Sequence, residues 1–109
     1  MTPCTLYPFG YNTRMDIKTT ATFDTWLAGL RDRKAAAIIT ARIVRVAGGL
    51  LGDVKSVGGP VNELRIDYGP GYRVYFIKQG KTVIVLLCGG DKSTQQHDIK
   101  QAQKLALNP

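Results

Sequence analysis

The chain has 109 residues, of which 44% are hydrophobic, so it is long enough for one folded domain and too apolar to be disordered. Lys and Arg number 15 against 8 acidic residues, and the net charge of +7 favours an anionic partner, either nucleic acid or an acidic protein. No apolar run approaches the ~20 residues that a membrane-spanning helix needs. One histidine and two cysteines are too few for a structural zinc cluster.

The two cysteines, Cys4 and Cys88, lie in an expected tail and an expected buried strand, so no disulfide is predicted and a reducing cytoplasm fits best. Residues 1–14 contain prolines and a glycine, have no sustained periodicity and lack the features of a signal peptide. We expect them to be an extension that is poorly ordered unless a partner binds it, preceding a domain at residues 15–109. Neither a metal nor a cofactor is expected.

A strand and a helix are predicted at the start of this domain. Residues 14–20 alternate in polarity and end in residues that favour β-structure. Thr22 is the expected N-cap of the helix. Its buried face has apolar residues at i, i+3, i+4 and i+7, with Trp26 as a core anchor: Phe23, Trp26, Leu27 and Leu30.

A second helix is predicted over residues 33–47, with Asp32 as its N-cap and Gly48-Gly49 as its stop signal. The short connection between the two helices indicates a helical hairpin. Arg42 and Arg45 fall on one side of the second helix, and we interpret them as a solvated face. The residues that follow, up to Pro60, have the glycine and proline content of a loop.

Residues 63–76 are predicted to form a β-hairpin, because two alternating runs flank the turn Gly69-Pro70-Gly71. The alternation places Arg65 and Arg73 roughly opposite each other on the face away from the core. Like charges placed in this way destabilise a hairpin unless nearby acids offset them or an anion binds there. Both interpretations remain open, and the acids available on the same strand are Glu63 and Asp67.

A central strand and a last helix complete the predicted fold. Residues 81–88 are nearly all apolar, as expected of a strand covered on both faces, and Gly89-Gly90-Asp91-Lys92 is expected to close it. Ser93 to Gln96 fits a capping box that opens a helix through Leu107. The order is strand, two helices, three antiparallel strands and a helix, which predicts a small α+β fold with helices packed on one sheet.

Four cations, one of them from the loop that precedes the hairpin, are expected at the ends or on one face of this sheet: Lys55, Arg65, Arg73 and Lys92. Guanidinium and ammonium groups suit a phosphate. The cluster could hold an RNA backbone, or stabilise the charge that develops when a 2′-hydroxyl attacks the adjacent phosphate, a reaction that needs no metal. The sequence has no nucleophile elbow and no His/Cys dyad, so a general acid and base are not evident.

Several segments, in this order, resemble the HigB-like, phage-derived addiction-module killer proteins of the RelE/ParE toxin superfamily. The resemblance covers about residues 15–106 and depends on these segments: Phe23-Asp24-Thr25-Trp26-Leu27-Ala28-Gly29-Leu30-Arg31-Asp32, Gly52-Asp53-Val54-Lys55, Glu63-Leu64-Arg65-Ile66, Gly69-Pro70-Gly71-Tyr72-Arg73-Val74-Tyr75-Phe76 and Gly89-Gly90-Asp91-Lys92-Ser93-Thr94-Gln95.

The resemblance implies a RelE-like fold and a toxin encoded beside an antitoxin, often one of the helix-turn-helix type. It further implies an endoribonuclease that inhibits translation by cleaving mRNA in the ribosomal A site. Arg65, Arg73 and Lys92 match basic residues that would bind the scissile phosphate and stabilise the transition state, and Lys55 matches a basic region more loosely.

The chain departs from the pattern of the ribosome-dependent nucleases at two places. An acid, Glu63, stands near a position that is basic in those relatives, and the last helix has no tyrosine near His97. Three residues are therefore candidates for the general acid or base: Glu63, Asp91 and His97. Tyrosines of the hairpin are candidates for stacking on bases, although core packing is the stronger expectation for the second of them: Tyr68, Tyr72 and Tyr75.

Two other functions remain open. The ParE branch of the superfamily inhibits DNA gyrase by protein contact, and a prophage remnant could keep the fold and antitoxin binding without toxicity. The basic pair on the sheet, together with Lys92, favours the nuclease, because a gyrase inhibitor has no need of a phosphate site there.

Overall fold

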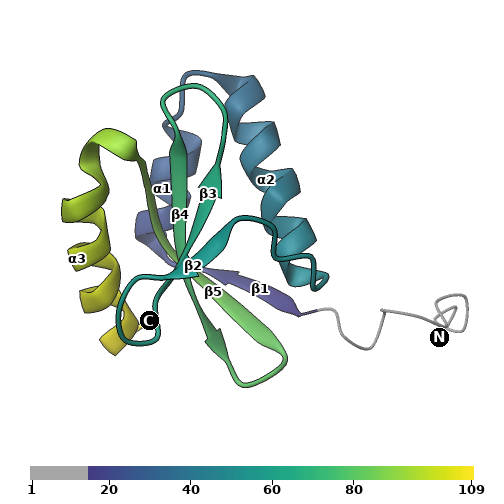
Figure 1. The fold of residues 1–109 in the computed structure, drawn as a ribbon, viewed down its shortest axis with the longest axis vertical. Coiled ribbons are helices and arrows are strands. Elements are labelled where there is room, and N and C mark those ends of the chain that lie inside the picture. Colours follow the sequence, from purple (N-terminus) through teal and green to yellow (C-terminus); the bar gives the residue numbers. More distant parts are fainter. Residues whose placement is uncertain (1–14) are drawn as a thin grey trace, which may run out of the picture.

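The computed structural model describes residues 15–109, in which three α-helices pack on a five-stranded sheet (Figure 1). The predicted α+β class is confirmed, and the expected extension, residues 1–14, lies outside the described residues. No helix within 15–109 is long and apolar enough to cross a membrane. In chain order the elements are β1 (Asp16–Thr19), α1 (Ala21–Ala28), α2 (Arg33–Ala47), β2 (Val54–Ser56), β3 (Asn62–Ile66), β4 (Tyr72–Gln79), β5 (Val83–Asp91), the 3-10 helix η3 (Lys92–Thr94) and α3 (Gln95–Leu107).

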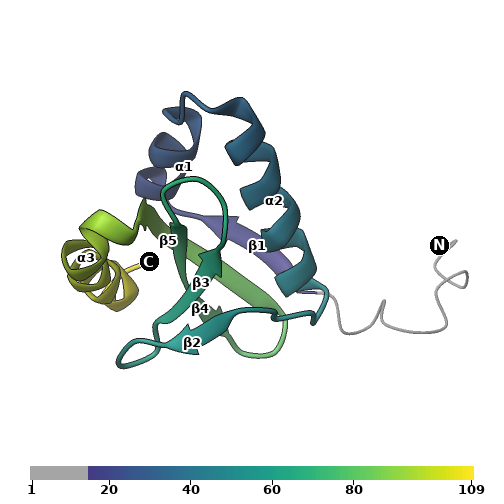
Figure 2. The same ribbon diagram turned by 45° about the horizontal axis from the view of Figure 1, so that its top comes forward.

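The sheet has the strand order β1-β5-β4-β3-β2 and is antiparallel except at one edge, where β1 pairs in parallel with β5. The predicted helical hairpin of α1 and α2 covers one face, and α3 covers the other (Figure 2). The central strand β5 is buried over most of its length, as its apolar sequence predicts. Two apolar clusters, one on each face, therefore hold the molecule together.

The predicted hairpin is formed by β3 and β4, and its register places Arg65 directly opposite Arg73. The alternate residues, among them Leu64 and Val74, pack under α1 and α2. The face that carries the arginines is not wholly open, because α3 covers its lower part, where Tyr75 is fully buried. The expectation that the arginine side of the hairpin is exposed is wrong for the part that α3 covers.

The first helix begins two residues earlier than predicted, because Thr20 and not Thr22 is its N-cap. The Thr20 hydroxyl accepts a hydrogen bond from the backbone N–H of Phe23 (3.0 Å) and donates one to the carbonyl oxygen of Leu87 (2.6 Å). The same side chain thus caps α1 and ties it to β5. The N-cap of α2 is Asp32, as predicted. Its Oδ1 accepts hydrogen bonds from the backbone N–H groups of Lys34 and Ala35.

The expected loop before the hairpin contains a strand. β2 pairs antiparallel with β3, so Lys55 lies opposite Glu63. Three residues are too few to produce a recognisable alternation in sequence, and the pairing depends on β3 already being in place. β2 is an edge strand of the sheet.

The end of β5 also differs from the prediction. Gly89, Gly90 and Asp91 continue the strand, where Asp91 pairs with Tyr72. Neither glycine is needed for a turn. A Cβ atom at Gly89 would collide with the ring of Trp26, and one at Gly90 would collide with the carboxylate of Asp98. Close approach of side chains from α1 and α3 therefore explains both glycines.

The capping box lies two residues earlier than predicted and opens η3, not α3. The Asp91 carboxylate accepts from the Ser93 N–H (2.8 Å), and the Asp91 N–H donates to the Thr94 hydroxyl (3.4 Å). The predicted last helix, α3, packs on the sheet through an apolar stripe, with Ala102 completely buried and Ile99 beside it. The strand end and η3 place Lys92 beside the hairpin turn.

Candidate functional site

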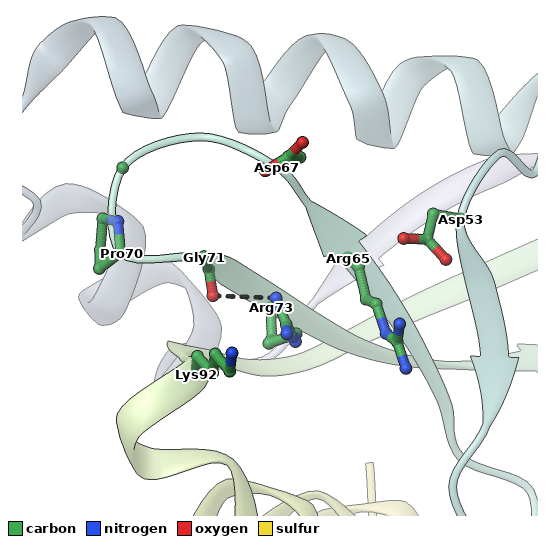
Figure 3. A pocket seen from close by; sticks show the side chains of 8 residues that line it. Asp53, Arg65, Asp67, Pro70, Gly71, Arg73 and Lys92 are labelled. Atoms are coloured by element: carbon green, nitrogen blue, oxygen red, sulfur yellow. Dashed lines mark hydrogen bonds between the residues drawn. The ribbon is translucent and has the colours of Figure 1, made fainter.

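An open groove of about 390 Å³ lies at the turn end of the hairpin (Figure 3). It brings together three of the four predicted cations: Arg65 from β3, Arg73 from β4 and Lys92 from the start of η3. Figure 3 shows the two arginines on neighbouring strands, with Lys92 beside Arg73. The complete lining is Asp53, Arg65, Asp67, Gly69, Pro70, Gly71, Arg73 and Lys92.

The fourth predicted cation, Lys55, does not line the groove. It is exposed on the edge strand β2, and its pairing with Glu63 places it on the same face of the sheet as the arginines. Lys55 could therefore contact a long ligand that leaves the groove across β2, but it is not part of the cluster itself.

Arg73 is the most firmly held cation of the groove. Its Nη1 donates to the carbonyl oxygens of Gly71 (3.0 Å) and Tyr72 (3.3 Å), and its side chain is only 12% exposed. Its Nε is buried and makes no hydrogen bond within residues 15–109. Arg65, by contrast, is 36% exposed. The structure thus provides one fixed guanidinium beside a more accessible one, an arrangement suited to a phosphate.

Glu63 lies beneath the two arginines and is completely buried, so it is not an exposed partner of the arginines on the surface of the sheet. Its Oε1 lies 3.3 Å from the Nε of Arg65 and 3.9 Å from the Nε of Arg73. Its Oε2 accepts hydrogen bonds from the Tyr75 hydroxyl (3.0 Å) and the Gln95 amide (2.8 Å). Because both oxygens face protein donors, Glu63 is poorly placed to take a proton from a substrate.

The other candidate acids and bases lie at the margin or outside the groove. A hydrogen bond from the Ser93 hydroxyl lowers the pKa of Asp91, which makes it a weaker base. The His97 side chain is 80% exposed, its Nδ1 lies 3.3 Å from the Asp98 carboxylate, and it does not line the groove. Burial raises the pKa of the Cys88 thiol to about 12, so this cysteine is inert at neutral pH.

Two carboxylates that sequence reasoning did not assign to catalysis line the groove, Asp53 and Asp67. Both are exposed, and neither lies within ion-pair distance of a cation in the part of the chain that the structure describes. Asp67 could have been found, because it alternates with Arg65 along one strand face. Asp53 could not, because only the pairing of β2 brings it near: its carbonyl oxygen accepts from the Arg65 N–H (2.9 Å).

The hairpin tyrosines differ in their availability for stacking. Tyr75 is buried, and burial together with the neighbouring Glu63 raises the pKa of its hydroxyl, so stacking on a base is excluded. Tyr72 packs edge-on against Trp26, with ring centroids 6.3 Å apart, which supports its expected core role. Tyr68 is half-buried, and its hydroxyl donates to Asp32 (3.3 Å).

The three cations and the carboxylates around them nearly balance. Arg65, Arg73 and Lys92 face the two acids of the rim, and Glu63 lies below. Recognition in this groove must therefore come from the direction of its donors more than from net charge. Within residues 15–109, no group of three or more His, Cys, Asp or Glu side chains is arranged to hold a metal ion.

Solved structures of other proteins share this architecture. The structure superposes on a chain of the toxin–antitoxin complex RelBE2 from Mycobacterium tuberculosis with a TM-score of 0.57 and 19% identity, over 72% of this chain and 99% of that one. The similarity to the conserved hypothetical protein HP0894 from Helicobacter pylori gives a TM-score of 0.48 and 16% identity, over 72% and 96%. The first of these two similarities shows that the chain has the predicted RelE-like fold.

In sequence, the chain is 56% identical over 92 residues to an uncharacterized protein of Haemophilus influenzae, which covers 84% of this chain and 93% of that protein. It belongs to the same family as that protein. No family model matches the chain. The HigB-like subtype remains a prediction.

Proposed function

We propose that this protein is the toxin of a toxin–antitoxin pair and acts as a ribosome-dependent, metal-independent mRNA endoribonuclease. The observation that carries this proposal is the convergence of Arg65, Arg73 and Lys92 in one groove. The fold supports it, because it is shared with a chain of a complex that is named as a toxin and its antitoxin. The resemblance of the sequence to RelE/ParE toxins is the second support.

The chemistry follows from the donors of the groove. The 2′-oxygen of a nucleotide attacks the adjacent phosphorus, a bond forms between them, and the bond from phosphorus to the 5′-oxygen of the next nucleotide breaks. Extra negative charge develops on the non-bridging oxygens. Arg73, already fixed by backbone carbonyls, and Arg65 would donate to those oxygens, with Lys92 adding a charge beside them.

The 2′-hydroxyl must lose its proton to a base in this reaction, and the leaving 5′-oxygen takes up a proton from water, which reaches the open groove. Glu63 is occupied by protein donors, so the carboxylates of the rim, Asp53 and Asp67, are better placed to accept the proton. They replace Glu63 as the first candidates, and Asp91 and His97 remain outer ones. The ribosome would then supply the orientation of the mRNA in this shallow site.

The proposed protein partner is a cognate antitoxin, expected to be of the helix-turn-helix type. Its gene should lie directly beside the gene of this protein, and co-expression should yield a complex that suppresses toxicity. The proposal of a toxin–antitoxin pair would be contradicted if no neighbouring gene encoded such a protein and no gene of the same operon encoded an inhibitor.

A second function is favoured by one observation. The cations of the groove are nearly matched by Glu63, Asp53 and Asp67, which weakens attraction for RNA and would suit a protein that inhibits gyrase by contact or has lost toxicity.

The direct test is brief induction in cells, followed by mapping of mRNA 5′ ends. Arg73→Ala is the test variant, and Arg45→Ala, at an exposed arginine of α2 outside the groove, is the matched control.

New 5′ ends within translated frames, present with the control and absent with Arg73→Ala, are the expected result. Growth arrest with intact mRNA and induced DNA damage would move the protein to gyrase inhibition. No arrest from the wild type would leave a protein that only binds its antitoxin. Complex formation with the antitoxin serves as the folding check for each variant.

A further inference from the structure

The buried carboxylate beneath the groove has no role in the reaction as described above. We propose that Glu63 is a positioning residue that holds the guanidinium groups of Arg65 and Arg73 in the orientation that receives a phosphate. Its effect on cleavage rests on the proposed function, whereas its effect on the arginines does not.

The burial of Glu63 requires compensation, and the structure provides it on both sides. A fully buried carboxylate is costly unless donors satisfy it. Glu63 is 0% exposed, and its donors come from three elements of the fold. They are Arg65 on its own strand β3, Tyr75 on β4, and Gln95 in the first turn of α3. The Nε of Arg73 lies 3.9 Å away and adds a positive charge without a hydrogen bond.

The two oxygens of Glu63 have different tasks. Oε2 receives the Tyr75 hydroxyl and the Gln95 amide, which fix the carboxylate against the sheet and against α3. Oε1 faces both arginines, at 3.3 Å from the Nε of Arg65 and 3.9 Å from that of Arg73. One oxygen is thus shared between two guanidinium groups, while the other anchors it.

Sharing this oxygen solves a problem that the register creates. Arg65 and Arg73 lie directly opposite each other, and like charges so placed repel each other. Without Glu63, each guanidinium would gain by turning away from the other and into solvent. With Glu63 between their Nε atoms, the Nη atoms of Arg65 and the Nη2 of Arg73 remain available at the groove, which both residues line, while the Nη1 of Arg73 holds the backbone.

The variant Glu63→Gln distinguishes positioning from attraction by charge. It removes one negative charge and so makes the net charge of the groove more positive by one, and attraction alone then predicts tighter binding of RNA. Positioning predicts the opposite effect on the reaction: cleavage of ribosome-bound mRNA falls by about tenfold or more, through kcat and not through a higher KM. A general base would also lower kcat, but it would change the pH profile, whereas a positioning residue keeps the profile of the wild type.

A spectroscopic test separates this proposal from the proposed function. In 15N NMR spectra of the intact protein, the Nε–H groups of Arg65 and Arg73 should exchange slowly with water, and that of the exposed Arg31 quickly. Arg65→Lys and Arg73→Lys assign the signals. Glu63→Gln should shift both groove signals and speed their exchange. The wild-type spectrum keeps the proposal falsifiable even where this variant fails to fold.

Tyr75→Phe is the graded comparison, because it removes one of the two donors that anchor Oε2 and leaves Oε1 facing the arginines. It should change the arginine signals and the cleavage rate less than Glu63→Gln does. The proposal is overturned if the wild-type arginine Nε–H groups exchange as fast as that of Arg31, if Glu63→Gln leaves them unchanged, or if Tyr75→Phe disturbs them equally. If the wild type cleaves no mRNA but the arginine signals behave as expected, the positioning stands and the proposed function fails.

Discussion

At the scale of single residues, the two arginines of the groove are not equivalent. Arg73 is held by the carbonyl oxygens of Gly71 and Tyr72 and is mostly buried, whereas Arg65 is more exposed. A fixed donor loses no freedom when the transition state forms, so it contributes more than a mobile one. The planar guanidinium also cannot be replaced by an ammonium without losing its paired donors.

Arg73→Lys should therefore be more harmful than Arg65→Lys. We expect a loss of about 10²–10³-fold in kcat/KM for Arg73→Lys on ribosome-bound mRNA, in the range found when one transition-state donor is removed. The loss for Arg65→Lys should be about tenfold. Single-turnover cleavage of an end-labelled message measures both, and equal losses would contradict the assignment of Arg73 as the principal donor.

The rim carboxylates give a second prediction at this scale. Asp53→Asn and Asp67→Asn each remove one possible proton acceptor without a known ion pair being lost. The variant that lacks the true acceptor should lose about 10²–10⁴-fold in kcat and the rise of the rate with pH. The other variant should retain both. If neither changes the rate or its pH profile, the acceptor lies elsewhere.

At the scale of elements, the junction of β5 with η3 determines where Lys92 lies. Two glycines of β5 let α1 and α3 approach the strand, and Asp91 then ends it as the cap of η3. The position of Lys92 in the groove therefore depends on three residues that do not line the groove themselves, Gly89, Gly90 and Asp91.

Gly89→Ala should destabilise the protein, because the added methyl group would overlap the Trp26 ring. Overpacking of this kind costs about 1–3 kcal/mol in the free energy of unfolding. Urea denaturation measures it. Gly48→Ala is the matched control: that glycine has φ −84° at the end of α2, where a Cβ would meet only ordinary contacts at 3.5 Å. A stability of Gly89→Ala equal to that of the control would contradict this packing.

The contribution of the η3 cap to the stability of the fold depends on pH, in a direction that follows from the pKa of Asp91. The hydroxyl of Ser93 is the main cause of the lowered pKa of Asp91. A carboxyl with a lowered pKa in the folded state stabilises the fold above its unfolded pKa of about 3.9, and this stabilisation is lost as the pH falls through the lowered value.

Ser93→Ala should accordingly raise the Asp91 pKa toward the ordinary value, and its stability deficit at neutral pH should shrink in acid. An NMR titration of the Asp91 side-chain carboxyl carbon measures the shift. Ser56→Ala, at an exposed position of β2, controls for the loss of a hydroxyl. An unchanged Asp91 pKa in Ser93→Ala would show that the backbone hydrogen bonds alone support the cap.

At the scale of the whole molecule, the surplus of positive charge lies mainly outside the nearly balanced groove. The connection between α1 and α2, together with the first two residues of α2, adds three exposed cations: Arg31, Arg33 and Lys34. It lies at the same end of the molecule as the hairpin turn, to which Asp32 is joined by the Tyr68 hydroxyl (Figure 1). This surface extends the groove with charges that rim acids do not offset and could guide the protein to ribosomal RNA.

Replacing these three cations by glutamine should weaken ribosome binding and reduce its dependence on salt, while cleavage at saturation stays the same. Binding measured over a range of salt concentrations tests this. The control replaces three exposed lysines in β1 and around the β4–β5 turn, away from the groove: Lys18, Lys78 and Lys81. Equal effects of the two sets would indicate that net charge alone matters.

Much of the fold could be predicted because its signals are local. The bounds of α2 follow from its caps, and the presence of the hairpin and of the apolar strand β5 follows from turns, alternation and an apolar run. Gly89 and Gly90 were misinterpreted as the end of a strand, because a glycine needed for close packing looks the same in sequence as one needed for a turn. The parallel place of β1 beside β5 also has no local signal.

The three cations of the groove and Asp67 could be predicted from the sequence, but the burial of Glu63 and the presence of Asp53 could not. Arg65 and Arg73 follow from strand alternation and hairpin register, and their position is observed. The burial of Glu63 depends on α3 covering the sheet, and the presence of Asp53 depends on β2 pairing with β3. Such tertiary contacts leave no periodic pattern in sequence. The roles of all these residues in a reaction remain predictions.

The parallel pairing of β1 with β5 has a consequence for the timing of synthesis. The first strand emerges early from the ribosome, but it has no partner until residues 83–86 follow, and Glu63 lacks its α3 contact until Gln95 is made. Contacts between such distant parts of a chain form late in folding. A nascent copy therefore has no complete groove while most of its own message is still being read, so the groove can bind a ligand only once the chain is nearly finished.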